Sequence, residues 1–236
     1  MAKTIDIRIG TIATTAMVAV PAGKGPFPGV VITFHRGGLD DVTEWMVDNC
    51  AAEGFATVAP NHYHVMPPGA DVEERTKYIT DEQMTLDHKA GAEWLMAQTN
   101  VDSSRLALIG TCMGGRATLV GLETYPDLWK CGCIWYGGGC FRQLKGAMAA
   151  PGSDDRLKLL ACPIMGFYGD LDKNPPPEDV VRLDDLLTAH GKPHEFHRYA
   201  EAGHSFLNPY APDKYVERAA KDSWTRAMAF LKTHLA

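Results

Sequence analysis

The sequence predicts an α/β domain built on a mostly parallel sheet, because short apolar runs alternate with longer amphipathic segments along its 236 residues. Residues 29–34 form an almost unbroken apolar run, which is typical of a strand buried on both faces. A helical pattern and a second such run follow by residue 60, and this strand–helix–strand order requires a right-handed crossover between parallel neighbours. With 45% hydrophobic residues, the chain can bury one large core, so we expect a single domain over residues 1–236.

Alternating polar and apolar residues at 4–9 and 14–20, with Gly10 near the turn, predict an antiparallel pair at one edge of the sheet. The remaining elements follow in order and give a sheet of about seven to eight strands flanked by helices. Further strands are expected at residues 29–34, 55–60, 106–109, 131–136, 163–168 and 194–199, and helices at residues 41–53, 72–98, 117–120 and beyond, 179–190 and 215–235. A polar excursion is expected at residues 143–157.

The segment 105–116 contains the most informative motif, an apolar strand followed by Gly110-Thr111-Cys112-Met113-Gly114 and then a helical pattern. This is the nucleophile elbow Gly-x-Ser-x-Gly with cysteine in place of serine. A nucleophile on such a strained turn must be exposed, and glycine neighbours leave the room that it needs. The start of a helix also favours a thiolate. The alternative is a small buried cysteine between two chance glycines.

Charge and composition exclude several classes of partner. A net charge of -6 gives no basic surface for nucleic acid or an anionic membrane, and no segment approaches the roughly 20 apolar residues of a membrane span. We therefore expect a soluble, cytoplasmic protein, monomeric or weakly homo-oligomeric. The six cysteines lie mostly in apolar contexts, so reduced thiols are expected. They are Cys50, Cys112, Cys131, Cys133, Cys140 and Cys162.

In a mostly parallel sheet, sites lie beyond the carboxyl ends of the strands. Here a thiol, a carboxylate and an imidazole occur at such ends in the order Cys112, Asp170 or Asp172, and His204. This is the chain order Ser, Asp, His of α/β-hydrolases, with sulfur in place of oxygen. The histidine would act as general base and acid, and the aspartate would fix its tautomer.

Three motifs together resemble the dienelactone hydrolase family, cysteine-dependent α/β-hydrolases that open lactone or enol-ester rings. They are Gly-Thr-Cys-Met-Gly-Gly at 110–115, Tyr-Gly-Asp-Leu-Asp at 168–172 with a proline after it, and Gly-His-Ser-Phe at 203–206. The resemblance implies Cys112 as nucleophile, His204 as base, Asp172 as the orienting acid and a compact fold without a large lid. The spacing Gly-x-x-Asp counted from Gly169 selects Asp172, which leaves Asp170 as a loop or capping residue.

The oxyanion hole needs two backbone donors, and the expected ones are the N–H groups of Met113 and Gly37. The family carries a glutamate in the turn near Gly37, whereas this chain has His35-Arg36 there. Arg36 would either favour the thiolate and bind a substrate carboxylate, or form an outward salt bridge.

Substrate contacts are expected from a further set of polar side chains. Arg75 and Tyr78 resemble the family's carboxylate-binding residues, but Leu207-Asn208-Pro209 stands where the family tends to have an arginine. The loss of this positive charge predicts a less acidic ester or lactone. The full set of candidate substrate-binding residues is His35, Arg36, Tyr63, Arg75, Tyr78 and Ser205.

These observations predict a cofactor-free carboxylic ester hydrolase that opens a lactone or cleaves a small ester through an acyl-cysteine intermediate. A thioesterase or broad carboxylesterase on the same triad is one alternative, and a small-molecule-binding homologue with little catalytic power is another. No metal is expected, because a metal site needs three or four converging ligands and the second group of possible histidine ligands spans Gly191, Pro193 and a strand that sends alternate side chains to opposite faces. Those ligands are His62 and His64 with His35, or His190, His194 and His197.

Overall fold

The computed structural model describes residues 1–138 and 155–236, whose strands form one eight-stranded sheet in the order β1-β2-β4-β3-β5-β6-β7-β8. Only the β1/β2 and β2/β4 pairs are antiparallel, and the other neighbours are parallel. The predicted edge hairpin and mostly parallel sheet are therefore confirmed. The strands are β1 (Lys3–Ile9), β2 (Ile12–Ala19), β3 (Phe27–Thr33), β4 (Ala56–Pro60), β5 (Val101–Thr111), β6 (Cys131–Trp135), β7 (Ile164–Gly169) and β8 (His194–Tyr199).

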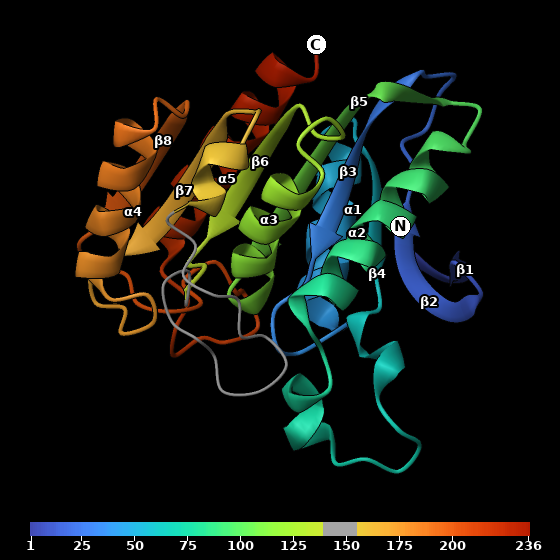
Figure 1. Cartoon of the computed structure of the whole chain (residues 1–236), viewed down its shortest axis with the longest axis horizontal. Coiled ribbons are helices and arrows are strands. Elements are labelled where there is room, and N and C mark those ends of the chain that lie inside the picture. Colours follow the sequence, from blue (N-terminus) through green and yellow to red (C-terminus); the bar gives the residue numbers. More distant parts are fainter. Residues whose placement is uncertain (139–154) are drawn as a thin grey trace.

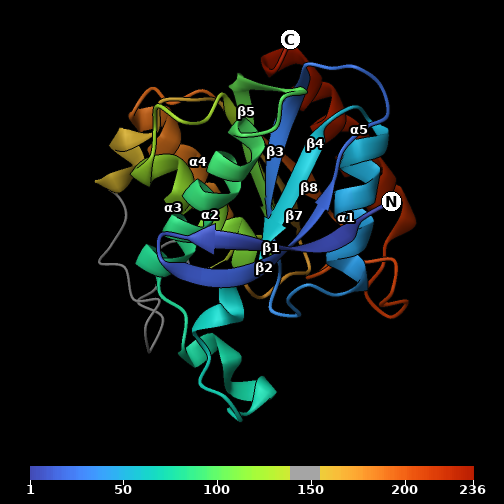
Figure 2. The same ribbon diagram turned by 90° about the vertical axis from the view of Figure 1, so that its right-hand side faces the viewer.

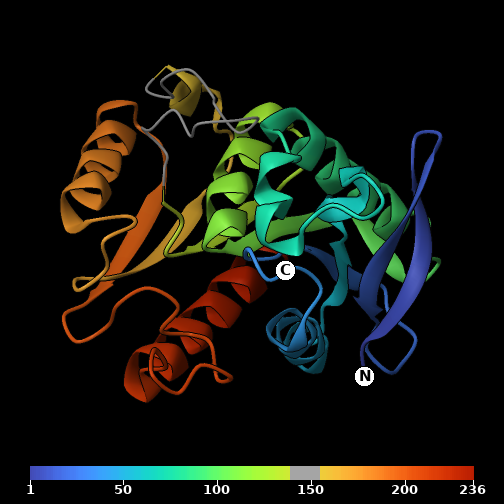
Figure 3. The same cartoon turned by 90° about the horizontal axis from the view of Figure 1, so that it is seen from below.

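Helices cover both faces of the sheet. Figures 1 and 3 show α1 and α5 on one face and α2, α3 and α4 on the other. The helices are α1 (Asp41–Ala52), α2 (Asp81–Met96), α3 (Met113–Thr124), α4 (Pro177–Ala189) and α5 (Glu217–His234), with short 3₁₀ helices η1 (His62–Val65), η2 (Val72–Lys77) and η3 (Arg156–Leu159). In the described part of the chain, no helix is both long and apolar enough to cross a bilayer.

The prediction of one continuous helix over residues 72–98 is wrong in its first third. The structure has η2 there, which ends at Lys77, and α2 begins only at Asp81. The break follows from capping, because the Thr80 side chain accepts a hydrogen bond from the Gln83 backbone N–H at 3.0 Å and starts a new helix. η2 and α2 are therefore two separate elements, and α2 begins only after residue 80.

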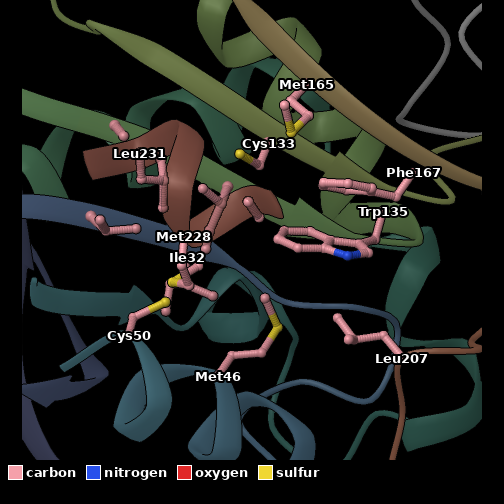
Figure 4. Close-up of a cluster of buried hydrophobic side chains, with 14 of the residues drawn as sticks. Ile32, Met46, Cys50, Cys133, Trp135, Met165, Phe167, Leu207, Met228 and Leu231 are labelled. Carbon is pink, nitrogen blue, oxygen red and sulfur yellow. The ribbon is translucent and has the colours of Figure 1, made fainter. Parts of the chain in front are cut away.

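The core lies in two layers, one on each face of the sheet. On the α1 and α5 face, Met46, Trp135 and Leu231 belong to one buried cluster, which Figure 4 shows in close-up. On the opposite face, Leu95 from α2 and Leu122 from α3 pack with strand residues in a second cluster. Because both faces are covered, β3 to β7 read as continuous apolar runs rather than as alternating ones.

Residues 61–80 leave the sheet at the carboxyl end of β4 and contain both η1 and η2. Figures 1 and 2 show this excursion beyond the carboxyl ends of the strands, on the side where β3 and β5 also end. The predicted polar excursion at 143–157 falls largely in residues 139–154, outside the described residues, and Cys140 lies there as well.

Candidate active site

Cys112 occupies a strained turn between β5 and α3. Its backbone has φ 56° and ψ −120°, a conformation that costs a non-glycine residue on the order of 1–3 kcal/mol. Its N–H donates to the Trp135 carbonyl oxygen at 2.9 Å, which anchors the turn to the end of β6. The first helical residue of α3 is Met113, so the cysteine lies at the helix N-terminus, where the helix dipole favours negative charge.

The glycines of the motif are required by close backbone approach. A Cβ on Gly110 would lie 2.4 Å from the Gly114 carbonyl oxygen, and one on Gly114 would lie 2.1 Å from the Thr33 carbonyl oxygen. Both distances are far below any real Cβ contact. Gly110 therefore lets the elbow close, and Gly114 lets α3 begin directly beside the end of β3.

Cys112, His204 and Asp172 form one hydrogen-bonded chain. The Cys112 Sγ atom lies 3.0 Å from His204 Nε2, and His204 Nδ1 lies 2.8 Å from Asp172 Oδ2. The other Asp172 oxygen accepts from the Asn174 N–H at 2.8 Å, which fixes the carboxylate in its loop after β7. The aspartate is buried, so a histidine N–H is the natural partner for its charge.

The His204 ring is predisposed to carry a proton. Its burial opposes protonation, but the hydrogen bonds to Asp172 and to Cys112 outweigh this effect and raise the pKa of His204 to about 10. A protonated ring beside sulfur favours the thiolate form of a cysteine. His204 therefore carries its positive charge beside the Cys112 sulfur at neutral pH.

Asp170 has a different environment from Asp172. Its Oδ1 atom accepts from Arg198 Nε at 2.7 Å, in a pair that is partly open to solvent. The structure therefore brings Asp172, and not Asp170, into contact with His204.

Tyr136 is a neighbour of the candidate triad that the sequence did not reveal. It follows β6 with φ 38°, and its buried ring lies 5.1 Å from the His204 ring and 5.3 Å from the Phe206 ring. Ser205 also has a positive φ, of 66°, and its carbonyl oxygen accepts from the Asn208 N–H at 2.9 Å. The Tyr136 ring therefore packs against the His204 ring, and the hydrogen bond between Asn208 and Ser205 closes the turn that follows His204. In the sequence Tyr136 is the last residue of the strand expected at 131–136, and this position gives no sign of a contact with His204.

The turn after β3 spans residues 34–38, hereafter the 34–38 turn. His35 Nε2 lies 2.8 Å from Asp40 Oδ2, and the Gly37 N–H donates to His35 Nδ1 at 3.3 Å. Arg36 points outward, where its Nη2 donates to the Glu73 carbonyl oxygen at 2.7 Å and lies 3.8 Å from the Glu73 carboxylate. Of the two alternatives for Arg36, this geometry favours the outward salt bridge.

Two of the candidate substrate-binding residues donate hydrogen bonds to the backbone of the 34–38 turn. The Tyr63 hydroxyl donates to the Arg36 carbonyl oxygen at 2.9 Å, and Arg75 Nη1 donates to the Gly37 carbonyl oxygen at 2.8 Å. Tyr78 directly follows η2, and its N–H donates to the Arg75 carbonyl oxygen at 3.2 Å. The sequence predicted Tyr63, Arg75 and Tyr78 as substrate-binding residues, and it gave no indication of these contacts with the backbone.

A buried polar network below η1 was also missed. Asp87 on α2 accepts from His62 at 2.8 Å and lies 3.0 Å from His64 Nε2, and these hydrogen bonds lower the pKa of Asp87 although its burial acts to raise it. Next to it, His88 Nε2 lies 2.9 Å from Thr33 Oγ1, and burial lowers the pKa of His88 to about 3. Across residues 1–138 and 155–236, no three His, Cys, Asp or Glu side chains are arranged to hold a metal ion.

Comparison with known proteins shows the family of the chain. The model of the dienelactone hydrolase family matches residues 14–235. A Methylorubrum extorquens protein named "Putative carboxymethylenebutenolidase" is 28% identical over 226 residues, covering 92% of this chain and 75% of that protein. The "Carboxymethylenebutenolidase" of Rhodococcus opacus is 25% identical over 197 residues, with 78% and 73% covered.

A solved structure has the same architecture over nearly its whole length. The crystal structure titled "Putative Dienelactone Hydrolase" from Klebsiella pneumoniae superposes with a TM-score of 0.86 and is 26% identical, covering 98% of this chain and 99% of that one. The predicted α/β-hydrolase fold is thereby confirmed.

Proposed function

The chain belongs to the dienelactone hydrolase family, and on this basis we propose that it hydrolyses a lactone or small carboxylic ester through an acyl-cysteine intermediate. Cys112 is the nucleophile, His204 the acid and base, and Asp172 the group that orients the ring. The observation that supports this assignment most directly is the 3.0 Å contact between Cys112 Sγ and His204 Nε2 in line with the 2.8 Å contact to Asp172.

Acylation begins with attack of the Cys112 thiolate on the ester carbonyl carbon. The S–C bond forms, and the carbonyl π electrons move to oxygen and give a tetrahedral oxyanion. When this intermediate collapses, the C–O bond breaks and the leaving oxygen takes the proton from His204. In a lactone the leaving alcohol stays attached, so the ring opens on the enzyme.

Deacylation uses the histidine in its other role. Once Cys112 is acylated, the sulfur charge that helps to raise the pKa of His204 is gone, and the ring can accept a proton from water. The resulting hydroxide attacks the thioester carbon, and the S–C bond breaks to release the acid and restore the thiolate. Asp172 stabilises the imidazolium that forms in each half-reaction.

The oxyanion would be held by the Met113 N–H and a donor from the 34–38 turn, of which Gly37 N–H is our candidate. Met113 is the first residue of α3, where an N–H has no partner within the helix. The Gly37 N–H currently donates to His35 Nδ1 at 3.3 Å, longer than the usual 2.9–3.0 Å, so a charged oxygen can compete for it.

The surroundings of the site support an uncharged or weakly acidic substrate. Arg36 is engaged with Glu73 on the surface, and Leu207-Asn208-Pro209 follows the histidine loop without a basic side chain. Neutral lactones and short-chain esters are therefore the first substrates to examine.

The test compares wild type with Cys112→Ala and Cys112→Ser on p-nitrophenyl acetate and on dihydrocoumarin. We expect Cys112→Ala to lose about 10⁴-fold or more of kcat/KM, and Cys112→Ser to retain the fold with a much lower rate. Rapid quenching with acid should trap an acetyl group on the wild-type peptide that contains Cys112. Hydrolysis at the wild-type rate by Cys112→Ala would refute the mechanism.

A further inference from the structure

We propose that Tyr63 and Arg75 are positioning residues that orient the peptide planes of the 34–38 turn, and with them one side of the oxyanion hole. This inference rests on the proposed function, because that function assigns a donor role to the turn. In this proposal residues 61–80 affect catalysis through the 34–38 turn and do not contact the reacting atoms.

The first contact fixes the peptide plane that carries the Gly37 N–H. The Tyr63 hydroxyl donates to the Arg36 carbonyl oxygen at 2.9 Å. This carbonyl and the Gly37 N–H belong to one planar trans peptide, so the direction of one group determines the direction of the other. Holding the Arg36 oxygen from outside therefore sets where the Gly37 N–H points.

The second contact fixes the next plane. Arg75 Nη1 donates to the Gly37 carbonyl oxygen at 2.8 Å, and the N–H of this same peptide, from Gly38, donates to the His35 carbonyl oxygen at 3.1 Å. Gly37 has no side chain of its own, and glycine loses more conformational freedom on ordering than any other residue. Its two flanking planes therefore depend on the surrounding side chains for their orientation.

Tyr63 also contacts the other side of the predicted hole. Its hydroxyl lies 3.9 Å from Met113 Sδ, and its ring packs at a small cluster of Ile79, Met84 and Ala117. Burial raises the pKa of Tyr63 to about 12, so the hydroxyl keeps its proton and stays a donor. One side chain thus relates the 34–38 turn to the residue that supplies the other candidate N–H.

Tyr63 itself is held in place by α2. Its two neighbours in η1, His62 and His64, both contact Asp87, at 2.8 and 3.0 Å, and their side chains are almost fully buried. The Arg75 guanidinium lies 5.3 Å from the centre of the Tyr63 ring, so the two positioning residues also contact each other. The chain of contacts runs from α2 through η1 to the turn.

The experiment distinguishes an effect on the oxyanion hole from an effect on the reactivity of the nucleophile. Iodoacetamide alkylates the Cys112 thiolate without forming an oxyanion, whereas butyraldehyde adds to it as a hemithioacetal. In that addition the S–C bond forms, the C=O π bond opens and the oxygen takes the proton of His204, so the new hydroxyl occupies the hole. Protection of Cys112 from iodoacetamide by butyraldehyde gives the Kd of the adduct, and p-nitrophenyl acetate gives kcat and KM.

We expect Tyr63→Phe and Arg75→Met each to lower kcat and weaken the butyraldehyde adduct by about 10-fold, a fraction of the 10²–10³ lost with an entire oxyanion donor. Their alkylation rates should stay within about 2-fold of wild type, since Cys112, His204 and Asp172 are untouched. Arg75→Lys should recover part of the loss because lysine can still donate to a carbonyl oxygen. Tyr125→Phe is the matched control, since Tyr125 follows the last residue of α3 and its ring lies near Lys89, at the opposite end of the helix from the turn.

Unchanged adduct affinity in Tyr63→Phe and Arg75→Met would overturn the inference, and so would alkylation rates that fall in parallel with it. If wild type bound butyraldehyde but turned over no ester, the proposed function would fail. In that case the affinity of the butyraldehyde adduct in Tyr63→Phe and Arg75→Met, compared with wild type, would still test the positioning role. Thermal unfolding of each variant shows whether a loss reflects a damaged fold.

Discussion

Gly114 begins α3 so close to β3 that a Cβ at position 114 would lie 2.1 Å from the Thr33 carbonyl oxygen. This contact brings Met113, at the helix N-terminus, beside the 34–38 turn that follows Thr33. Backbone from two separated parts of the sequence thereby forms one face of the candidate site.

Gly114→Ala should push α3 away from β3 and separate the two candidate oxyanion donors. We expect a destabilisation of about 1–3 kcal/mol from overpacking and a loss of more than about 10-fold in esterase kcat. Urea unfolding and p-nitrophenyl acetate kinetics measure the two effects. Gly191→Ala is the control, because Gly191 also resists substitution, with φ 62°, but faces open space. It should cost about 1–2 kcal/mol and leave activity intact. Wild-type activity in Gly114→Ala would contradict the role of this contact.

Asp172→Asn and Asp170→Asn form a second matched pair. Asp172 contacts His204 and is buried, whereas Asp170 pairs with Arg198 near the surface. We expect Asp172→Asn to reduce kcat/KM on the order of 10²-fold or more, because the amide no longer fixes the reactive tautomer. Asp170→Asn should change it by less than about 2-fold, as an exposed ion pair contributes little. The reverse pattern would show that the orienting acid has been misassigned.

The pH dependence of Cys112 alkylation should reveal the state of His204. Its pKa is raised from 6.5 to about 10, so the ring stays protonated throughout that interval and loses its charge only as the pH rises through about 10. On the proposed mechanism this imidazolium holds Cys112 as a thiolate, and the alkylation rate of wild type by iodoacetamide should then be nearly constant between pH 6 and pH 9. In His204→Gln we expect a rate about 10-fold or more lower at pH 7 that climbs with pH, since an unassisted thiol has a pKa of about 8.5 and is mostly protonated there.

Burial raises the pKa of each of the other thiols within residues 1–138 and 155–236, so these thiols should react slowly with iodoacetamide. These are Cys50, Cys131, Cys133 and Cys162. Cys112→Ala provides the control and should remove the fast alkylation phase altogether. A wild-type rate that rises steadily from pH 6 to pH 9 would argue against the thiolate–imidazolium pair.

The sequence alone identified the parallel sheet and the three residues of the candidate triad, because these depend on local patterns. Strands buried on both faces are continuous apolar runs, and the strained elbow at Cys112 needs glycines at fixed spacing. Asp170, Asp172 and His204 follow strands whose ends a parallel sheet brings to one edge, and the Gly-x-x-Asp spacing of the family then selected Asp172.

Only the tertiary structure decided how the 34–38 turn is held and what the polar residues around it contact. Tyr63 and Arg75 reach backbone carbonyl groups that have no sequence signature, and Arg36 turns to Glu73 because η2 lies beside it. The single helix expected from residue 72 is instead two elements, η2 and α2, and α2 begins at the Thr80 cap. Local patterns fix which groups a strand or helix carries, but packing between distant segments fixes the direction in which each group points.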